Sequence, residues 1–225
     1  MNNLHIFGDS FSVSWKDGIE RDTRWNPDNS KTKRNLYQEY KDYLGRLPVH
    51  FADIINDHFK FNKVFNYSLG GASNDTILQT IGSNIDKIQK DDYVIVGWSD
   101  LIRYRVLHRD FTHWVHILPN SKTLLKEESF KRSCIEELVH RDIKYNYLIG
   151  NHISMRNLVT KALPCKHLFW TPFAQKNKQV DFYPGFLSRI VTETNGKVDD
   201  GHYGEEGMKQ LGKILIDKIE YNNLI

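Results

Sequence analysis

The sequence predicts an α/β fold, with three α/β/α layers around a parallel sheet of four to five strands, formed as a single domain by residues 1–225. Two observations indicate this fold. Short apolar segments alternate along the chain with segments whose apolar residues recur at helical spacing. In addition, residues 93–98 are apolar at successive positions, as expected of a strand that is buried on both faces of a parallel sheet. Such alternation favours parallel strands with helices packed on both faces.

Four strands are expected from short apolar runs, at residues 4–7, 64–67, 93–98 and 167–170. In a doubly wound sheet of the flavodoxin type, these strands take the order 2-1-3-4, with any fifth strand at an edge. In such sheets ligands bind beyond the carboxyl ends of the strands. Residues that directly follow each strand are therefore the first candidates for a functional site.

Three helices are expected from their apolar spacing. Pro48 opens the first, and its apolar face covers residues 51–59. Ser73 is the expected N-cap of the second, whose apolar positions continue to Ile88. The third helix covers residues 205–221 and directly follows a polar segment that contains histidine.

The segments between these elements are expected to be loops or an insertion. Residues 15–37 are polar and rich in turn-forming residues, so they predict a long surface loop. Residues 174–200 are expected to be mostly loop, with a short helix near 186–191. A helical insertion is expected after the third strand, at about residues 100–163. Its predicted helices cover residues 127–140 and 145–163.

Composition excludes several classes of protein. A net charge of +3 in 225 residues is too small and too dispersed for a dedicated nucleic-acid binder. No apolar run approaches the ~20 residues of a membrane span. The two cysteines, Cys134 and Cys165, are too few for a disulfide framework or a thiolate metal site, so we expect free thiols and no bound metal. The amino terminus has no signal-peptide pattern, which predicts a cytoplasmic or virion-associated protein.

Four short motifs lie at the ends of predicted strands or just before the last helix. Gly8-Asp9-Ser10 follows the first strand and can present a hydroxyl at the sheet edge. Paired glycines, Gly70-Gly71, follow the second strand and can free a backbone amide to face a developing negative charge. Gly97-Trp98-Ser99-Asp100 ends the third strand. Asp199-Asp200-Gly201-His202 precedes the last helix, and a neighbouring carboxylate can orient its histidine as a general base.

Taken alone each motif is weak, but their order along the whole chain resembles that of the SGNH hydrolases, also called GDSL esterases and lipases. The resemblance implies that Ser10 is the nucleophile and that His202 takes its proton. It also implies that the backbone N–H groups of Ser10 and Gly71 line an oxyanion hole. The family's closing motif is Asp-x-x-His, which ranks Asp199 first as the residue that orients His202, with Asp200 as the alternative.

The chain departs from the family pattern at one position. Ser99 stands where the family has an asparagine whose side chain completes the oxyanion hole. Three interpretations stay open: Ser99 donates through a shifted geometry, Asn74 supplies an amide instead, or the hole is incomplete and the protein is weak or inactive. The candidates for substrate binding, chosen for their place near the strand ends, are Asp9, Asn74, Trp98 and Arg103.

We therefore expect a serine-dependent ester hydrolase without a cofactor, which removes O-acyl groups, O-acetyl above all, from carbohydrate or small esters. The alternative is a module of the same fold that binds glycans or serves a structural role, for example in a phage virion. A nucleotide binder is disfavoured because neither glycine-rich phosphate motif occurs in the chain. A metal hydrolase built on Asp9, Asp199, Asp200 and His202 is disfavoured because the adjacent serine makes a triad the simpler account.

Overall fold

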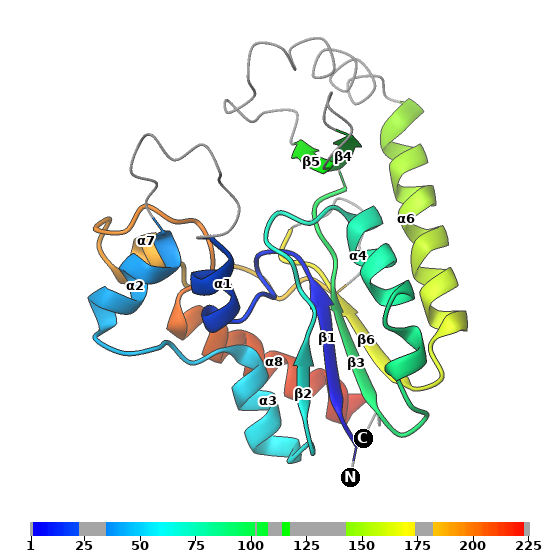
Figure 1. The fold of residues 1–225 in the computed structure, drawn as a ribbon, viewed down its shortest axis with the longest axis horizontal. Helices are drawn as coiled ribbons and strands as arrows, with labels where there is room; N and C mark the ends of the chain where they lie inside the picture. The colour runs from blue at the N-terminus through cyan, green and yellow to red at the C-terminus, as the bar shows by residue number, and fades with distance from the viewer. Residues whose placement is uncertain are drawn as a thin grey trace.

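A computed structural model confirms the predicted α/β fold and strand order. The structure describes residues 2–22, 35–101, 103–107, 114–117, 143–173 and 182–222. Its main sheet has four parallel strands in the order β2-β1-β3-β6. These strands are β1 (Leu4–Gly8), β2 (Val64–Asn66), β3 (Tyr93–Gly97) and β6 (Lys166–Trp170). Figure 1 shows the sheet at the centre, with helices on both sides.

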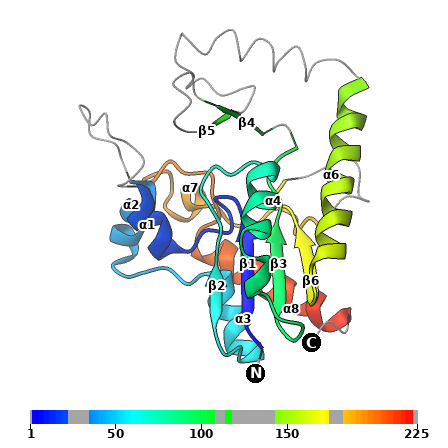
Figure 2. The same ribbon diagram turned by 45° about the vertical axis from the view of Figure 1, so that its right-hand side comes forward.

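The central strands are buried throughout because both faces of the sheet are covered. Each residue of β1 and β3 is buried. Helices α3 (Phe51–Phe59) and α8 (Glu205–Tyr221) pack together on one face. Helices α4 (Asn74–Gly82) and α6 (Ile143–Ala162) cover the other face (Figures 1 and 2).

Alternate residues of each strand enter separate hydrophobic cores on the two faces. In β1, Leu4 and Ile6 pack towards α3 and α8, whereas Phe7 packs on the side of α4 and α6. In β3, Ile95 and Val96 divide in the same way. Because the four strands are parallel, the loops that follow them lie at the same carboxyl edge, where the candidate motifs meet.

The helices expected from apolar spacing are present, with revised ends. Helix α8 has the predicted bounds, and Ser73 caps α4 by accepting a hydrogen bond from the Thr76 N–H. Helix α4 ends at Gly82, and a 3-10 turn, η1 (Ile85–Lys87), continues its apolar spacing. Helix α3 begins after His50 rather than at Pro48, because the His50 ring and Asp53 form a capping box there.

The prediction of a loop over residues 15–37 is wrong for the part that the structure describes. Helix α1 (Trp15–Asp22) occupies its start, and α2 (Leu36–Leu44) begins at its end. Trp15 and Tyr40 are both buried and their rings are in contact, with centroids 5.4 Å apart. This packing joins the two helices and overrides the local turn signals, which carry no information about a partner so distant in sequence.

The insertion after β3 is not purely helical. It begins with an antiparallel pair of strands, β4 (Tyr104–Leu107) and β5 (Trp114–Ile117), which lies beyond the carboxyl edge of the main sheet in Figure 1. Helix α6 agrees with the helix predicted at residues 145–163, whereas the helix predicted at 127–140 lies outside the described residues. A short helix, α7 (Ile190–Glu193), lies slightly later than the expected one.

The amino edge of the sheet, where the parallel strands begin, lies opposite the carboxyl edge that holds the candidate motifs. Strand β1 begins and helix α8 ends at the amino edge, on the side of the sheet away from the candidate motifs (Figure 1). Cys165, next to β6, is a buried free thiol, and Cys134 lies outside the described residues. No helix within the described part of the chain is long and apolar enough to cross a membrane.

Candidate active site

The turn after β1 holds Ser10 at the carboxyl edge of the sheet. The Asp9 carbonyl accepts a hydrogen bond from the Ser12 N–H at 2.9 Å, and the Asp9 carboxylate accepts one from the Phe11 N–H at 3.0 Å. Ser12 is fully buried against Gly8 and Gly97, where an added Cβ would collide with its hydroxyl. The two glycines therefore let this turn pack tightly against the ends of β1 and β3.

His202 lies on the loop before α8 and contacts Ser10 directly. Its Nε2 is 2.7 Å from the Ser10 Oγ, and its Nδ1 is 2.5 Å from the Asp200 Oδ1. The same Asp200 oxygen also accepts a hydrogen bond from the His202 backbone N–H at 2.9 Å. Serine, histidine and aspartate thus form one continuous chain of hydrogen bonds, although 192 positions in sequence separate Ser10 from His202.

The structure corrects the ranking of the two acidic residues. Asp200 is buried and contacts both the ring and the backbone of His202, whereas Asp199 is exposed. Neighbouring residues in an extended loop point in opposite directions, so only one of them can reach the histidine. The backbone fixes which one, because Val191 N–H donates to the Asp200 carbonyl at 3.0 Å and Ile190 N–H to the His202 carbonyl at 2.9 Å.

Electrostatics keep the Asp200 carboxyl ionised. Burial by itself would raise the pKa of Asp200, but the hydrogen bonds and charge of His202 outweigh it and hold that pKa below its usual value. The Asp200 side chain is only 4% exposed, while that of His202 is 28% exposed. The acid is therefore shielded within the protein, and the histidine is accessible from solvent.

Two aromatic rings from other elements frame His202. The Phe11 ring lies 4.8 Å from the His202 ring, between centroids, and the Tyr37 ring lies 6.0 Å from it. The Tyr37 hydroxyl also donates a hydrogen bond to the Ser10 carbonyl at 3.3 Å. Helix α2 thus contributes to the site through Tyr37, a residue that the sequence had placed in a loop.

The loop after β2 is tied to the turn that carries Ser10. The Asn66 amide donates to the Ser12 carbonyl at 2.7 Å and accepts from the Ser68 N–H at 2.9 Å. Gly71 follows in this loop with a positive φ of 74°, a conformation that favours glycine. Its predicted role, and that of the Ser10 N–H, as oxyanion donors stay predictions.

Asn74 and Ser99 pair with each other rather than standing apart. The Asn74 Oδ1 accepts from the Ser99 N–H at 2.8 Å, and the Asn74 Nδ2 donates to the Ser99 carbonyl at 3.3 Å. This double hydrogen bond joins the first turn of α4 to the end of β3. Ser99 is fully buried, so its hydroxyl is not exposed to a ligand. The Asn74 amide is therefore already engaged in holding the site together.

Arg103 connects two of the candidate motifs. Its Nη1 lies 3.5 Å from the Asp9 Oδ2 and 3.4 Å from the Ala72 carbonyl oxygen, next to Gly71. Asp9 is fully buried, and this burial raises its pKa more strongly than the charge of Arg103 lowers it. The expectation that Asp9 binds substrate is corrected, because its carboxyl lies beneath the site and is not exposed to a ligand.

Trp98 is also misplaced by the sequence prediction. It is fully buried in the core between the sheet and helices α4 and α6. Its ring packs edge-on against His152 of α6, with centroids 5.1 Å apart, and against Phe169 of β6 at 5.9 Å. A ring in this position stabilises the core and cannot stack on a substrate.

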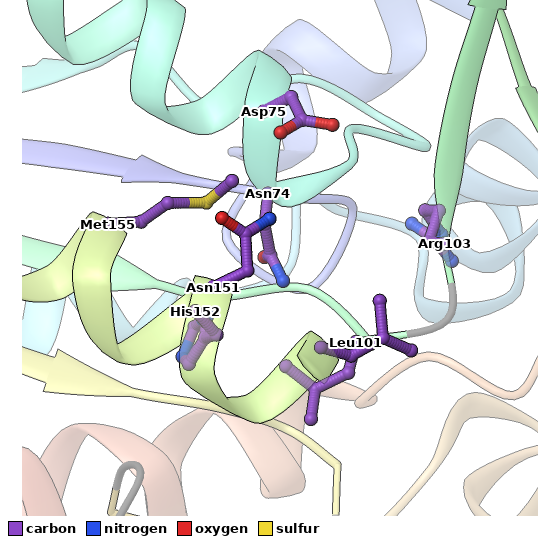
Figure 3. A pocket seen from close by; sticks show the side chains of 8 residues that line it. Asn74, Asp75, Leu101, Arg103, Asn151, His152 and Met155 are labelled. Carbon is purple, nitrogen blue, oxygen red and sulfur yellow. The ribbon is translucent and has the colours of Figure 1, made fainter. Parts of the chain in front are cut away.

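A pocket adjoins the site and contains residues that the sequence analysis missed. Two of the residues predicted to bind substrate, Asn74 and Arg103, line it together with Asn151 and His152 of α6 (Figure 3), and their binding role stays a prediction. Its remaining lining residues are Asp75, Leu101, Leu148 and Met155. No local signal could have placed Asn151 here, because its position depends on how α6 returns against α4.

Comparisons with known proteins give distant structural likenesses. No family model and no curated protein matches the chain. The fold is similar to the lipase/acylhydrolase from Enterococcus faecalis, at 11% identity and a TM-score of 0.41, over 99% of this chain and 97% of that chain. It is also similar to a structure described as a "putative GDSL-like lipase" from Bacteroides uniformis ATCC 8492, at 12% identity and a TM-score of 0.38, over 98% and 96% of the two chains. The functional assignment rests on the contacts of Ser10, His202 and Asp200.

Proposed function

We propose that the protein is a serine-dependent ester hydrolase with Ser10 as its nucleophile. The observation that carries this proposal is the hydrogen-bond chain from the Ser10 hydroxyl through His202 to the buried Asp200 carboxylate. A serine hydroxyl is a weak nucleophile until a neighbouring base accepts its proton. A 2.7 Å contact with the His202 ring nitrogen supplies that base within hydrogen-bonding distance.

In the proposed reaction, Ser10 Oγ attacks the acyl carbon of the ester while His202 Nε2 takes the hydroxyl proton. His202 Nδ1–H donates to Asp200, which fixes the tautomer and stabilises the positive ring. The tetrahedral intermediate collapses to an acyl-serine, and the alcohol leaves with the proton from His202. Water then attacks the acyl-serine with His202 again acting as base, which releases the acid and restores Ser10.

The oxyanion of each intermediate needs hydrogen-bond donors. We propose that the backbone N–H groups of Ser10 and Gly71 are these donors. The Asn66 side chain joins the two loops that carry them. Ser99 is buried at the position where related enzymes use asparagine, so this hole has fewer side-chain donors. Loss of one such donor typically lowers kcat by ~10²–10³. This burial favours, as a second candidate function, a weakly active or inactive module that binds glycans.

The proposed substrates are O-acetyl esters of carbohydrate or other small alcohols. Their support is the pocket beside the site, whose lining includes the Asn151 amide. Amide groups both donate and accept hydrogen bonds, as do the hydroxyl groups of a sugar. A long acyl chain would instead require an extended apolar surface.

Covalent labelling with a fluorophosphonate tests the assignment without a known substrate. We expect one adduct per chain on Ser10, located by intact mass and peptide mapping, and none in Ser10→Ala. Ser14→Ala, a nearby serine that bonds to Asp17, is the matched control and should label as the wild type does. A folded wild-type protein that forms no adduct would show that Ser10 is not activated and would favour the binding module.

A further inference from the structure

The pocket in Figure 3 is lined by both polar and apolar groups. It lies between the first turn of α4, the middle of α6 and the segment that follows β3. The Asn151 side chain projects from α6 towards the first turn of α4, where the Asn74 amide is held by Ser99. The apolar lining residues are Leu101, Leu148 and Met155.

Two of the lining residues connect this pocket to the candidate active site. Arg103 lines the pocket and lies 3.5 Å from the carboxylate of Asp9, the residue that precedes Ser10. Asn74 lines the pocket and bonds to both backbone groups of Ser99. A ligand in the pocket therefore contacts the same side chains that hold the loops of the active site in place.

The charges at the pocket favour a neutral ligand. Arg103 supplies the only cationic side chain of fixed charge among the lining residues, and the Asp9 carboxylate already lies beside it. Asp75, also at the pocket, disfavours an anionic ligand. An amide beside aliphatic groups matches a sugar ring or similar polyol, which has hydroxyl groups at its edge and C–H groups on its faces.

We propose that this pocket binds the neutral, hydroxyl-rich alcohol portion of the ester and that Asn151 determines specificity for it. The inference rests on the proposed hydrolase function and deepens it, because it assigns the recognition of the alcohol to a residue of the insertion. Ser10 and His202 act on the ester bond, while Asn151 lies outside their hydrogen-bond chain. Its loss should weaken binding of a sugar ester without slowing the chemical step.

The test compares Asn151→Ala with wild type on two acetate esters, a mono-O-acetylated methyl glucoside and para-nitrophenyl acetate. Loss of one hydrogen bond of ~1 kcal/mol should raise KM for the glucoside about 5-fold and leave its kcat unchanged. Both constants for para-nitrophenyl acetate, which has no sugar, should be unchanged. Asn157→Ala is the matched control, since Asn157 is an exposed asparagine of α6 outside the pocket lining.

A binding measurement separates failure of this inference from failure of the proposed function. Calorimetry with the acetylated glucoside uses the Ser10→Ala protein, with and without Asn151→Ala. Weaker binding in the double variant supports the pocket even if the wild type hydrolyses neither ester, an outcome that would refute only the hydrolase. The inference is overturned if Asn151→Ala behaves as Asn157→Ala does, if it affects both esters equally, or if Ser10→Ala does not bind the glucoside.

Discussion

His202 is held from both sides of its ring, and this arrangement assigns different tasks to neighbouring residues. One ring nitrogen contacts the Ser10 hydroxyl and the other contacts Asp200. Asp200 is buried and bonded, whereas Asp199, one position earlier, is exposed. The two side chains are chemically identical. They differ in burial and in bonding because the backbone points them in different directions.

Exchange of each acid for its amide should separate these roles. Asp200→Asn is expected to lower kcat for para-nitrophenyl acetate by about 10⁴, because an amide favours the wrong tautomer of His202. Asp199→Asn keeps the Asp200–His202 contact, so its kcat should stay within about two-fold of wild type. Circular dichroism should show both variants folded. A larger loss from Asp199→Asn than from Asp200→Asn would refute the assignment.

At the residue scale, the sequence predicts which residues form the site better than it predicts where each side chain points. The pairing of Ser10 with His202 was predicted from the resemblance to the SGNH hydrolases, and the two side chains are in contact at 2.7 Å. The choice between Asp199 and Asp200 could not be made, because it depends on backbone hydrogen bonds to Ile190 and Val191. Trp98 was misassigned for a similar reason, since a motif at the end of a strand does not say which side chains enter the core.

At the scale of elements, helix α8 begins without a side-chain cap of its own. Gly204 is its N-cap, and the Glu193 carboxylate from α7 accepts hydrogen bonds from the Glu206 and Gly207 N–H groups at 3.1 and 3.2 Å. The Tyr40 hydroxyl donates to Glu193 and accepts from the Glu205 N–H. Because His202 lies just before this helix, the same contacts fix the loop that carries it.

Removal of this distant cap should affect both stability and catalysis. Glu193→Ala is expected to reduce the free energy of unfolding by about 1–2 kcal/mol, the usual cost of losing an N-cap. It should also lower kcat, because the loop of His202 loses its support. Glu206→Ala is the matched control, since it removes an exposed carboxylate from the same turn but no cap, and its cost should stay below about 1 kcal/mol. Urea unfolding and para-nitrophenyl acetate kinetics measure both effects, and equal losses would contradict the capping role.

Elements with their own periodic signal were the ones that the sequence could predict. Strand β3 and helix α8 have apolar patterns that match their burial in the structure. Helices α1 and α2 were missed because the turn-forming residues of this segment were given more weight than the local signals of α2, whose N-cap is Asn35 and whose C-cap is Gly45. The antiparallel pair of β4 and β5 was missed because the two strands lie within the insertion. The fold was predicted from the alternation of strands and helices, and the insertion is not part of that alternation.

At the scale of the whole molecule, one buried histidine makes folding sensitive to acid. His50 caps α3 through a ring nitrogen that accepts from the Ala52 N–H at 3.2 Å. The residue is only 3% exposed, and its burial lowers the pKa of His50 from 6.5 to about 3. The folded protein therefore keeps His50 neutral at pH values where the unfolded chain binds a proton.

This difference sets the pH range in which stability decreases. The contribution of neutral His50 is complete above pH 6.5 and is lost as the pH falls towards about 3, by ~1.4 kcal/mol per pH unit. His50→Asn keeps an N-cap acceptor and removes the titrating group, so its unfolding free energy should fall less steeply in this range. His58→Asn, an exposed histidine of the same helix, is the control and should retain the wild-type slope. Chemical denaturation from pH 7 to 4 measures the slopes, and equal slopes for all three proteins would rule out His50 as their source.

The separation of the two sheet edges has a practical consequence for orientation. Strand β1 begins and helix α8 ends at the amino edge, whereas Ser10, His202 and the pocket lie at the carboxyl edge (Figure 1). Attachment of the protein to a solid support through residues of the amino edge would therefore leave the side that holds Ser10 and His202 uncovered.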